Sequence, residues 1–189
     1  WISSADMDIL KARGVGVGHC PSSNMKLASG VAPVVQYLKR DIAIGLGPDG
    51  PAGSNNDFNL FEEMDLAAKL QKVTTMNPTA ITAEQAFEMA TIRGARALSM
   101  DMEIGSLESG KKADLIVIRA DRPHALPIYN VYSQLVYALK GSDVTDVIVN
   151  GRVVVRGSKV LTVDLPTVSR KSLQWQEKIQ KSIASEGGK

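Results

Sequence analysis

The nine residues IAIGLGPDG, residues 42–50, decide the fold class of this chain. They combine a short apolar run with a turn of glycine, proline and aspartate, which is typical of a buried strand. A second short apolar run, residues 15–19, comes earlier, and a helical pattern that begins near Pro33 separates the two. Short apolar runs that alternate with helices indicate parallel strands joined by crossover helices. The first half of the chain therefore predicts an α/β fold.

Three helix starts in this half carry capping signals. They are Ser3 with Asp6, Asp57 by itself, and Thr82 with Gln85. The helix after Thr82 is predicted to continue to Leu98, because small residues recur on one of its faces at helical spacing.

The second half of the chain is predicted to be mainly antiparallel β structure. The predicted strands are residues 114–119, 144–149, 152–156 and 159–163. Asn150 and Gly151 between two of them predict a tight hairpin, and residues 131–138 indicate a strand or a turn followed by a strand. An apolar stripe after Pro166 predicts a final helix. The chain is therefore predicted to divide into three parts. They are the α/β part (residues 1–102), the β part (residues 103–163), and the final helix with the tail (residues 164–189).

Bulk composition narrows the classes of function. The net charge of +2 gives no electrostatic case for a nucleic acid or an anionic membrane as partner. No apolar run has the length of a membrane span, and no signal-peptide pattern opens the chain. The lone Cys20 excludes an internal disulfide and suits a reducing compartment, so we expect a cytoplasmic protein. The first residue is Trp1 rather than Met, which indicates processing or a sequence that begins within a longer protein.

Polar residues follow both predicted strands of the first half. A carboxylate at the position of Asp49 can bind a metal, act as a base, or both, whereas Pro-Asp-Gly is also a common turn sequence. His19 after the earlier strand can be a ligand, a substrate contact or a structural hydrogen-bonding group, and the last interpretation is favoured because no partner is evident. Cys20 could be a nucleophile only with a His beside it. Its neighbour His19 does not suit this role, since neighbouring side chains on a strand point to opposite faces. Cys20 is therefore interpreted as a small buried residue.

The count of metal ligands excludes a complete catalytic zinc site in this chain. Such a site usually takes three protein ligands and a water molecule. The chain has two histidines and no His-x-His pattern. Any metal held by Asp49 must take its other ligands from elsewhere.

Five segments, in this order, resemble the amidohydrolase superfamily, in particular the deaminases of S-adenosylhomocysteine and 5′-methylthioadenosine and the related triazine hydrolases. The segments are HCPSSNMKLASGVAPV (19–34), GLGPDGPAGSNNDFNLFEEMDLAAKLQK (45–72), ATIRGARAL (90–98), IGSLESGKKADLIVI (104–118) and YNVYSQLVYA (129–138). The resemblance implies the C-terminal part of a (β/α)8 TIM-type barrel. Residues 15–19 and 42–46 would be its seventh and eighth strands. Residues 103–163 would belong to a flanking small β-sandwich, and the final helix would pack back on the barrel.

The resemblance also implies the chemistry. Asp49 would be a metal ligand and the catalytic group that takes the proton from metal-bound water. The resulting hydroxide would attack a ring carbon that bears an amine and release ammonia. The divalent metal would be Zn, with Fe or Mn as alternatives, and its other ligands would precede this chain. The substrate would be a purine nucleoside or a related small heterocycle, with His19 and Asn24 bordering its pocket, and the protein would be a homo-oligomer.

Two positions depart from the pattern of the resembled proteins. Pro48 stands where Thr or Ser is usual, which removes a hydroxyl and a backbone donor beside Asp49. The loop that follows reads PAGSNND where AASNND is usual, a milder change.

Two other functions stay open. A triazine-type hydrolase would expel chloride or an alkylamine with the same site chemistry and a different pocket. A non-catalytic fragment would act only as a binding or scaffold module. A His-x-His encoded upstream of Trp1 would decide for the enzyme.

Two barrel strands cannot close a barrel, and their unpaired edges favour association. We therefore expect the isolated chain to be catalytically inactive and to dimerise, swap elements or bind its missing half. Analytical ultracentrifugation of the chain tests this. A stable monomer across the concentration range would contradict it.

Overall fold

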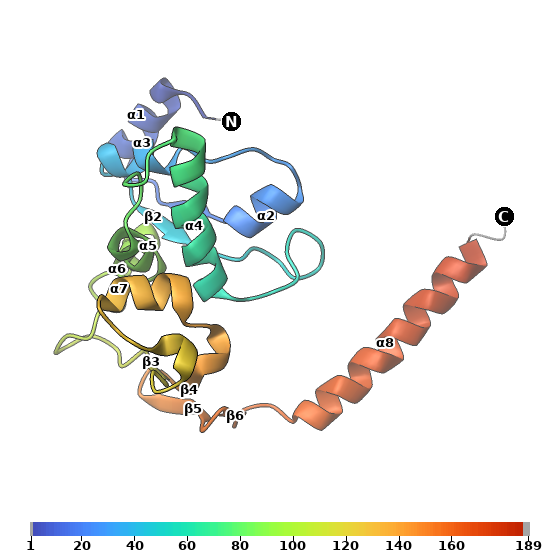
Figure 1. Cartoon of the computed structure of the whole chain (residues 1–189). Helices are drawn as coiled ribbons and strands as arrows, with labels where there is room; N and C mark the ends of the chain where they lie inside the picture. The colour runs from blue at the N-terminus through green and yellow to red at the C-terminus, as the bar shows by residue number, and fades with distance from the viewer. Residues whose placement is uncertain (1, 187–189) are drawn as a thin grey trace.

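The computed structural model describes residues 2–186, and its first half holds two parallel strands with helices around them (Figure 1). The elements are α1 (Ser4–Ala12), β1 (Val17–His19), α2 (Pro21–Lys26), α3 (Val34–Lys39), β2 (Ile44–Leu46), α4 (Leu60–Thr75), α5 (Ala83–Ala90) and α6 (Ile92–Ala97). The prediction of an α/β fold is confirmed.

The pairing of β1 with β2 is the centre of this half. Val17 pairs with Ile44, and His19 pairs with Leu46, in a parallel register. Ile44 is fully buried and belongs to an apolar core that α3, α4 and α5 complete. Burying this surface is the main stabilising contribution available to so short a strand pair.

The other face of the strand pair is made of glycines, and α6 approaches it closely. A Cβ added to Gly45 would lie 2.7 Å from the Cα of Gly94 on α6. A Cβ added to Gly16, just before β1, would lie 1.9 Å from the carbonyl oxygen of Ala97. Backbone therefore packs directly against backbone here, and a side chain at either strand position would push α6 away.

The helix predictions are confirmed at two starts and wrong at two points. Ser3 with Asp6 and Thr82 with Gln85 form reciprocal capping boxes. The long helix α4 begins at Leu60 after the N-cap Asn59 and not at Asp57, because residues 50–59 form an extended turn-rich loop. The predicted helix that follows Thr82 is interrupted at Thr91 (φ −128°, ψ −106°), where the chain turns from α5 into α6. The short helix α2 was not predicted.

The second half contains a four-stranded antiparallel sheet and several short helical turns. Its elements are β3 (Leu115–Ile118), η1 (Pro123–Ala125), α7 (Val131–Ser133), the π-helix η2 (Gln134–Ala138), η3 (Gly141–Asp143), β4 (Val144–Val149), β5 (Arg152–Arg156) and β6 (Lys159–Val160). The strands lie in the order β3-β4-β5-β6. Asn150 (φ 49°) and Gly151 (φ 76°) both have positive φ, as a two-residue hairpin turn requires, so the predicted hairpin is confirmed.

Residues 131–138 are helical, so the prediction of a strand there is wrong. Asn130 caps this segment by accepting a hydrogen bond from the Ser133 amide (2.9 Å). Val136 is fully buried in the apolar core, and the Tyr137 hydroxyl accepts a hydrogen bond from Lys72 of α4 (2.6 Å). These contacts with the first half override the β propensity of the segment.

The final helix α8 (Leu165–Glu186) forms as predicted but does not pack back on the rest of the chain (Figure 1). The side chains of Trp175, Ile179 and Ile183 on its apolar stripe are 61%, 55% and 65% exposed. Helix formation needs only local hydrogen bonds, whereas docking needs a complementary surface, and no such surface meets α8 within residues 2–186. None of the described helices is long and apolar enough to span a membrane.

The glycine-lined face generates a stability prediction. Gly16→Ala should lower the free energy of unfolding by about 1–3 kcal/mol, because its Cβ would overlap the Ala97 backbone. Gly18→Ala is the matched control, since nothing lies within 4 Å of its Cβ position and its φ is not positive. Urea unfolding monitored by circular dichroism measures both variants. Equal midpoints for the two would contradict the close packing of α6.

Candidate functional site

Asp49 lies in the loop that follows β2, three residues after Leu46, and is exposed to solvent. Its backbone has φ +64°, a left-handed conformation that Asp tolerates better than most residues. Its Oδ2 accepts a hydrogen bond from the Ser23 hydroxyl (2.7 Å), and its Oδ1 accepts one from the Gly50 amide (2.7 Å). Hydrogen bonds from Ser23, from Ser54 and from the Gly50 amide lower the pKa of Asp49 below its ordinary value. Asp49 is therefore a carboxylate at neutral pH, with lone pairs left for a further ligand.

Ser23 reaches Asp49 because α2 starts immediately after β1. Pro21 opens that helix, where its fixed φ suits the first turn and its missing amide costs nothing. The side chain of Ser23 is then buried against the loop after β2. The parallel pairing of β1 and β2 brings these two loops to the same edge of the sheet. Sequence reasoning missed Ser23, although its position in the segment that follows β1 was a usable signal.

The side chain of Glu63 on α4 contacts both of these segments. It is 1% exposed and accepts hydrogen bonds from the Ser22 amide (3.1 Å) and from the side-chain amide of Asn55 (3.3 Å). The Asn55 amide also donates to the carbonyl oxygen of Pro48 (2.7 Å). Sequence reasoning missed Glu63 as well, because a helical Glu is more often on a solvated face.

His19 is buried, with 2% of its surface exposed. Neither ring nitrogen has a hydrogen-bond partner among the described residues. Burial lowers the pKa of His19 to about 4, so its imidazole is neutral at pH 7. His19 lies across from Leu46 on the strand pair, whereas the Cys20 sulfur lies near Gly47, whose Cβ position is 3.7 Å away. The interpretation of His19 as a structural hydrogen-bonding group is therefore wrong within residues 2–186. The role of His19 as a substrate contact stays a prediction.

Asn24 lies one residue after Ser23 on α2 and is half-buried. It lines a cavity of about 410 Å³ together with Gly30 and Tyr37. Asp49 is not part of that lining. The predicted contact of Asn24 with a substrate therefore also stays a prediction.

Cys20 lies close enough to both acidic groups of the site for their charges to act on its thiol. Its thiol is half-buried, and burial together with the charges of Asp49 and Glu63 raises its pKa. A thiol with a raised pKa is a poor nucleophile at neutral pH. The interpretation of Cys20 as a small buried residue is confirmed only in part, because Cys20 is half-buried.

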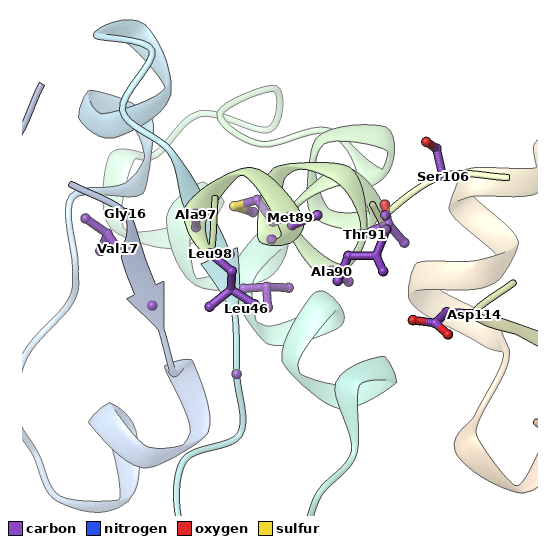
Figure 2. A pocket seen from close by; sticks show the side chains of 17 residues that line it. Gly16, Val17, Leu46, Met89, Ala90, Thr91, Ala97, Leu98, Ser106 and Asp114 are labelled. Carbon is purple, nitrogen blue, oxygen red and sulfur yellow. The ribbon is translucent and has the colours of Figure 1, made fainter. Parts of the chain in front are cut away.

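A second hollow, of about 510 Å³, lies against the glycine-rich strand face (Figure 2). Met89, Ala90 and Thr91 line it from the α5 end, and Asp114 supplies a carboxylate from the second half. Asp49 is not among its lining residues. Gly47, in the loop that carries Asp49, does line it, so the hollow borders that loop without including Asp49.

The side chains at the site could supply only part of the ligand set of a metal ion. Within residues 2–186, no group of three or more His, Cys, Asp or Glu side chains is arranged to hold a metal ion. The exposed, ionised carboxylate of Asp49 is suited to be one ligand.

Comparison with known families and structures agrees with the mixed α/β fold. The model of the amidohydrolase family matches residues 1–154, and the chain belongs to that family. It is 50% identical over 182 residues to a 5-methylthioadenosine/S-adenosylhomocysteine deaminase of Desulforudis audaxviator, covering 96% of this chain and 42% of the relative. It is 51% identical over 164 residues to a 5′-deoxyadenosine deaminase of Methanosarcina acetivorans, covering 87% and 37%. The chain thus spans about two fifths of the length of these relatives.

Solved structures show the same fold. The crystal structure of an adenosine deaminase from Xanthomonas campestris with bound zinc has a TM-score of 0.91 and 36% identity, covering 95% of this chain and 41% of that one. An atrazine chlorohydrolase from Arthrobacter aurescens TC1, complexed with zinc, has a TM-score of 0.84 and 25% identity, with 92% and 38% covered.

The Ser23 hydrogen bond generates a prediction about acidity. Ser23→Ala should raise the pKa of Asp49 toward its ordinary 3.8, because the strongest cause of the lowering is removed. Ser22→Ala is the control, since the Ser22 hydroxyl has no partner among the described residues and its backbone amide is retained. Carboxyl ¹³C NMR titration of Asp49 provides the measurement.

The lowered pKa of Asp49 also predicts how the stability of the protein depends on pH. A carboxyl whose pKa is lowered on folding contributes stability above about pH 4 that is lost as the pH falls through the folded pKa. Ser23→Ala should therefore reduce the acid dependence of stability in that window. An unchanged titration of Asp49 would exclude Ser23 as the cause.

Proposed function

We propose that this chain is the C-terminal part of a metal-dependent aminohydrolase, in which Asp49 is both a metal ligand and a proton carrier. The observation that carries the proposal is the geometry of Asp49. It stands after β2, ionised and exposed, with both oxygens oriented by donors from its own loop and from α2. A carboxylate at the carboxyl end of a parallel strand is the usual place for such a group in α/β enzymes.

In this proposal β1 and β2 are the seventh and eighth strands of a (β/α)8 barrel. Residues 1–102 are its barrel part, residues 103–163 belong to a flanking β-sandwich, and residues 164–189 form the terminal helix and tail. The parallel pairing of β1 with β2 and the separate antiparallel sheet support this division. The other metal ligands would come from residues outside this chain.

The chemistry at Asp49 follows from its hydrogen bonds. A bound divalent metal would supply Lewis acidity that makes water acidic enough to lose a proton near neutral pH. Asp49 would accept that proton as the water oxygen bonds to the ring carbon that bears the amine. It would then return the proton to the amine as the C–N bond breaks, so that ammonia leaves. Ser23 and the Gly50 amide would keep the carboxylate from rotating during both transfers. The Pro48 carbonyl, fixed by Asn55, would hold the loop that carries Asp49.

The substrate class is proposed from the relatives. The two deaminases described above are named for nucleoside-type substrates, so we propose a purine nucleoside or a related heterocycle. Zinc in the two solved structures supports Zn as the metal, with Fe or Mn as alternatives. We also propose a cytoplasmic location without a nucleic-acid or membrane partner, which the near-neutral charge and the single cysteine support. A homo-oligomer is proposed from the resemblance alone. The triazine hydrolase alternative rests on the chlorohydrolase structure.

The test uses the longer protein that includes any residues encoded upstream of Trp1. This protein is loaded with zinc before the assay. Asp49→Asn should lower kcat for ammonia release from 5′-methylthioadenosine by about 10²–10⁴-fold, because Asn cannot accept the proton. The variant should keep its fold, since Asn also tolerates positive φ.

Asp57→Asn is the control, because Asp57 is exposed in the same loop. Release of chloride from a chlorotriazine without deamination would favour the hydrolase alternative. No turnover of either substrate by the zinc-loaded protein would favour a scaffold role.

A further inference from the structure

The side chain of Glu63 is a buried carboxyl group without a cation beside it. It is 1% exposed. Among residues 2–186, no Lys, Arg or His nitrogen lies within 4.0 Å of its oxygens. Burying a carboxyl group is costly unless its oxygens find donors. The identity of those donors therefore indicates what this residue does.

Both donors come from the segments that hold Asp49. Glu63 Oε2 accepts from the Ser22 amide, and the next residue, Ser23, donates its hydroxyl to Asp49. Glu63 Oε1 accepts from the Asn55 side chain, which also donates to the carbonyl of Pro48, the residue before Asp49. The buried carboxyl group of Glu63 is thus connected indirectly to Ser23, which contacts Asp49, and to Pro48, which precedes Asp49.

The conformation of Asp49 needs such support. A positive φ costs free energy even at Asp, which tolerates it better than most residues, so contacts from the surroundings help to hold it. Pro48 cannot contribute an amide hydrogen bond to this turn. The Asn55 side chain, held in turn by Glu63, is a connection that fixes the Pro48 carbonyl from outside the turn.

The neighbouring Glu62 shows that helix position alone does not explain Glu63. Both residues are in the first turn of α4, where an acidic side chain favours the helix dipole. Glu62 is exposed and makes no side-chain hydrogen bond within the described residues. Only Glu63 reaches the two loops.

We propose that Glu63 is a positioning residue that fixes the Asp49 carboxylate through the Ser22–Ser23 and Asn55–Pro48 connections. It touches neither substrate nor reacting atoms. For catalysis, the inference rests on the function proposed above for Asp49. For the geometry of the loops, it stands independently of any activity.

The first test is amide hydrogen exchange measured by NMR on the protein encoded with its upstream sequence. In Glu63→Gln one of the two donors meets an NH₂ group, so at least one connection is lost. The amides of Ser22 and Gly50 should exchange about 10-fold faster or more, which corresponds to the loss of one hydrogen bond. Gly50 is the decisive reporter, because its amide contacts Asp49 and not Glu63. Glu62→Gln, with the same chemical change one residue earlier, should leave both amides unchanged.

The second test is kinetic and uses the zinc-loaded protein encoded with its upstream sequence. Loss of support for a metal ligand typically costs about 10–100-fold in activity or metal affinity. Glu63→Gln should therefore lower kcat by this amount with KM changed less than about 2-fold, because it displaces Asp49 and not the substrate pocket. Glu62→Gln should keep the kcat of the unsubstituted protein.

Asn55→Ala is a second variant that keeps the test valid if Glu63→Gln fails to fold. Asn55 lies in a loop, and its replacement removes the Pro48 connection together with the hydrogen bonds that its Oδ1 accepts from the Asn56 and Asp57 amides. It leaves the Ser22 connection to Glu63 in place. It should quicken exchange at Gly50 and lower kcat in the same direction by a smaller factor, while amides in the middle of α4 keep their protection. Unchanged Gly50 exchange in both variants would overturn the inference. Altered exchange in a protein that deaminates no substrate would support the positioning role and reject the proposed function.

Discussion

The parallel pairing of β1 with β2 is the constraint on which the site depends. Because the two strands run in the same direction, the segments after His19 and after Leu46 emerge at one edge. That edge places α2 beside the loop of Asp49, and the hydrogen bond from Ser23 to Asp49 follows from it. The close approach of α6 to the glycine-lined face fixes the strand pair from the other side.

Burial separates the roles of the two carboxyl groups near Cys20. Asp49 is exposed, ionised and free to bind a further ligand, whereas Glu63 is enclosed by donors from two loops. An exposed carboxylate can carry chemistry but is weakly constrained by itself. A buried one is strongly constrained but cannot reach a substrate. In the proposed function, Asp49 would be an accessible ligand and Glu63 would hold it in place, as catalytic geometry requires.

Local sequence patterns predicted much of this fold and failed where tertiary contacts prevail. The capping boxes at Ser3 and Thr82 and the hairpin at Asn150 were predicted, because each depends on residues a few positions apart. The helical segment 131–138 was not, because Val136 is buried in the core of the other half of the chain. The stripe on α8 predicted a helix, and nothing local could place it.

The sequence by itself determined the α/β character, the antiparallel second half and the position of Asp49 at the end of a strand, since apolar periodicity and turn residues encode these locally. Only the tertiary structure decided which groups surround Asp49. Ser23 is 26 residues away from it in sequence, and Ser22 is 41 residues from Glu63. Such pairs meet because strand pairing and helix packing bring distant segments together, and no pattern within one segment records that meeting.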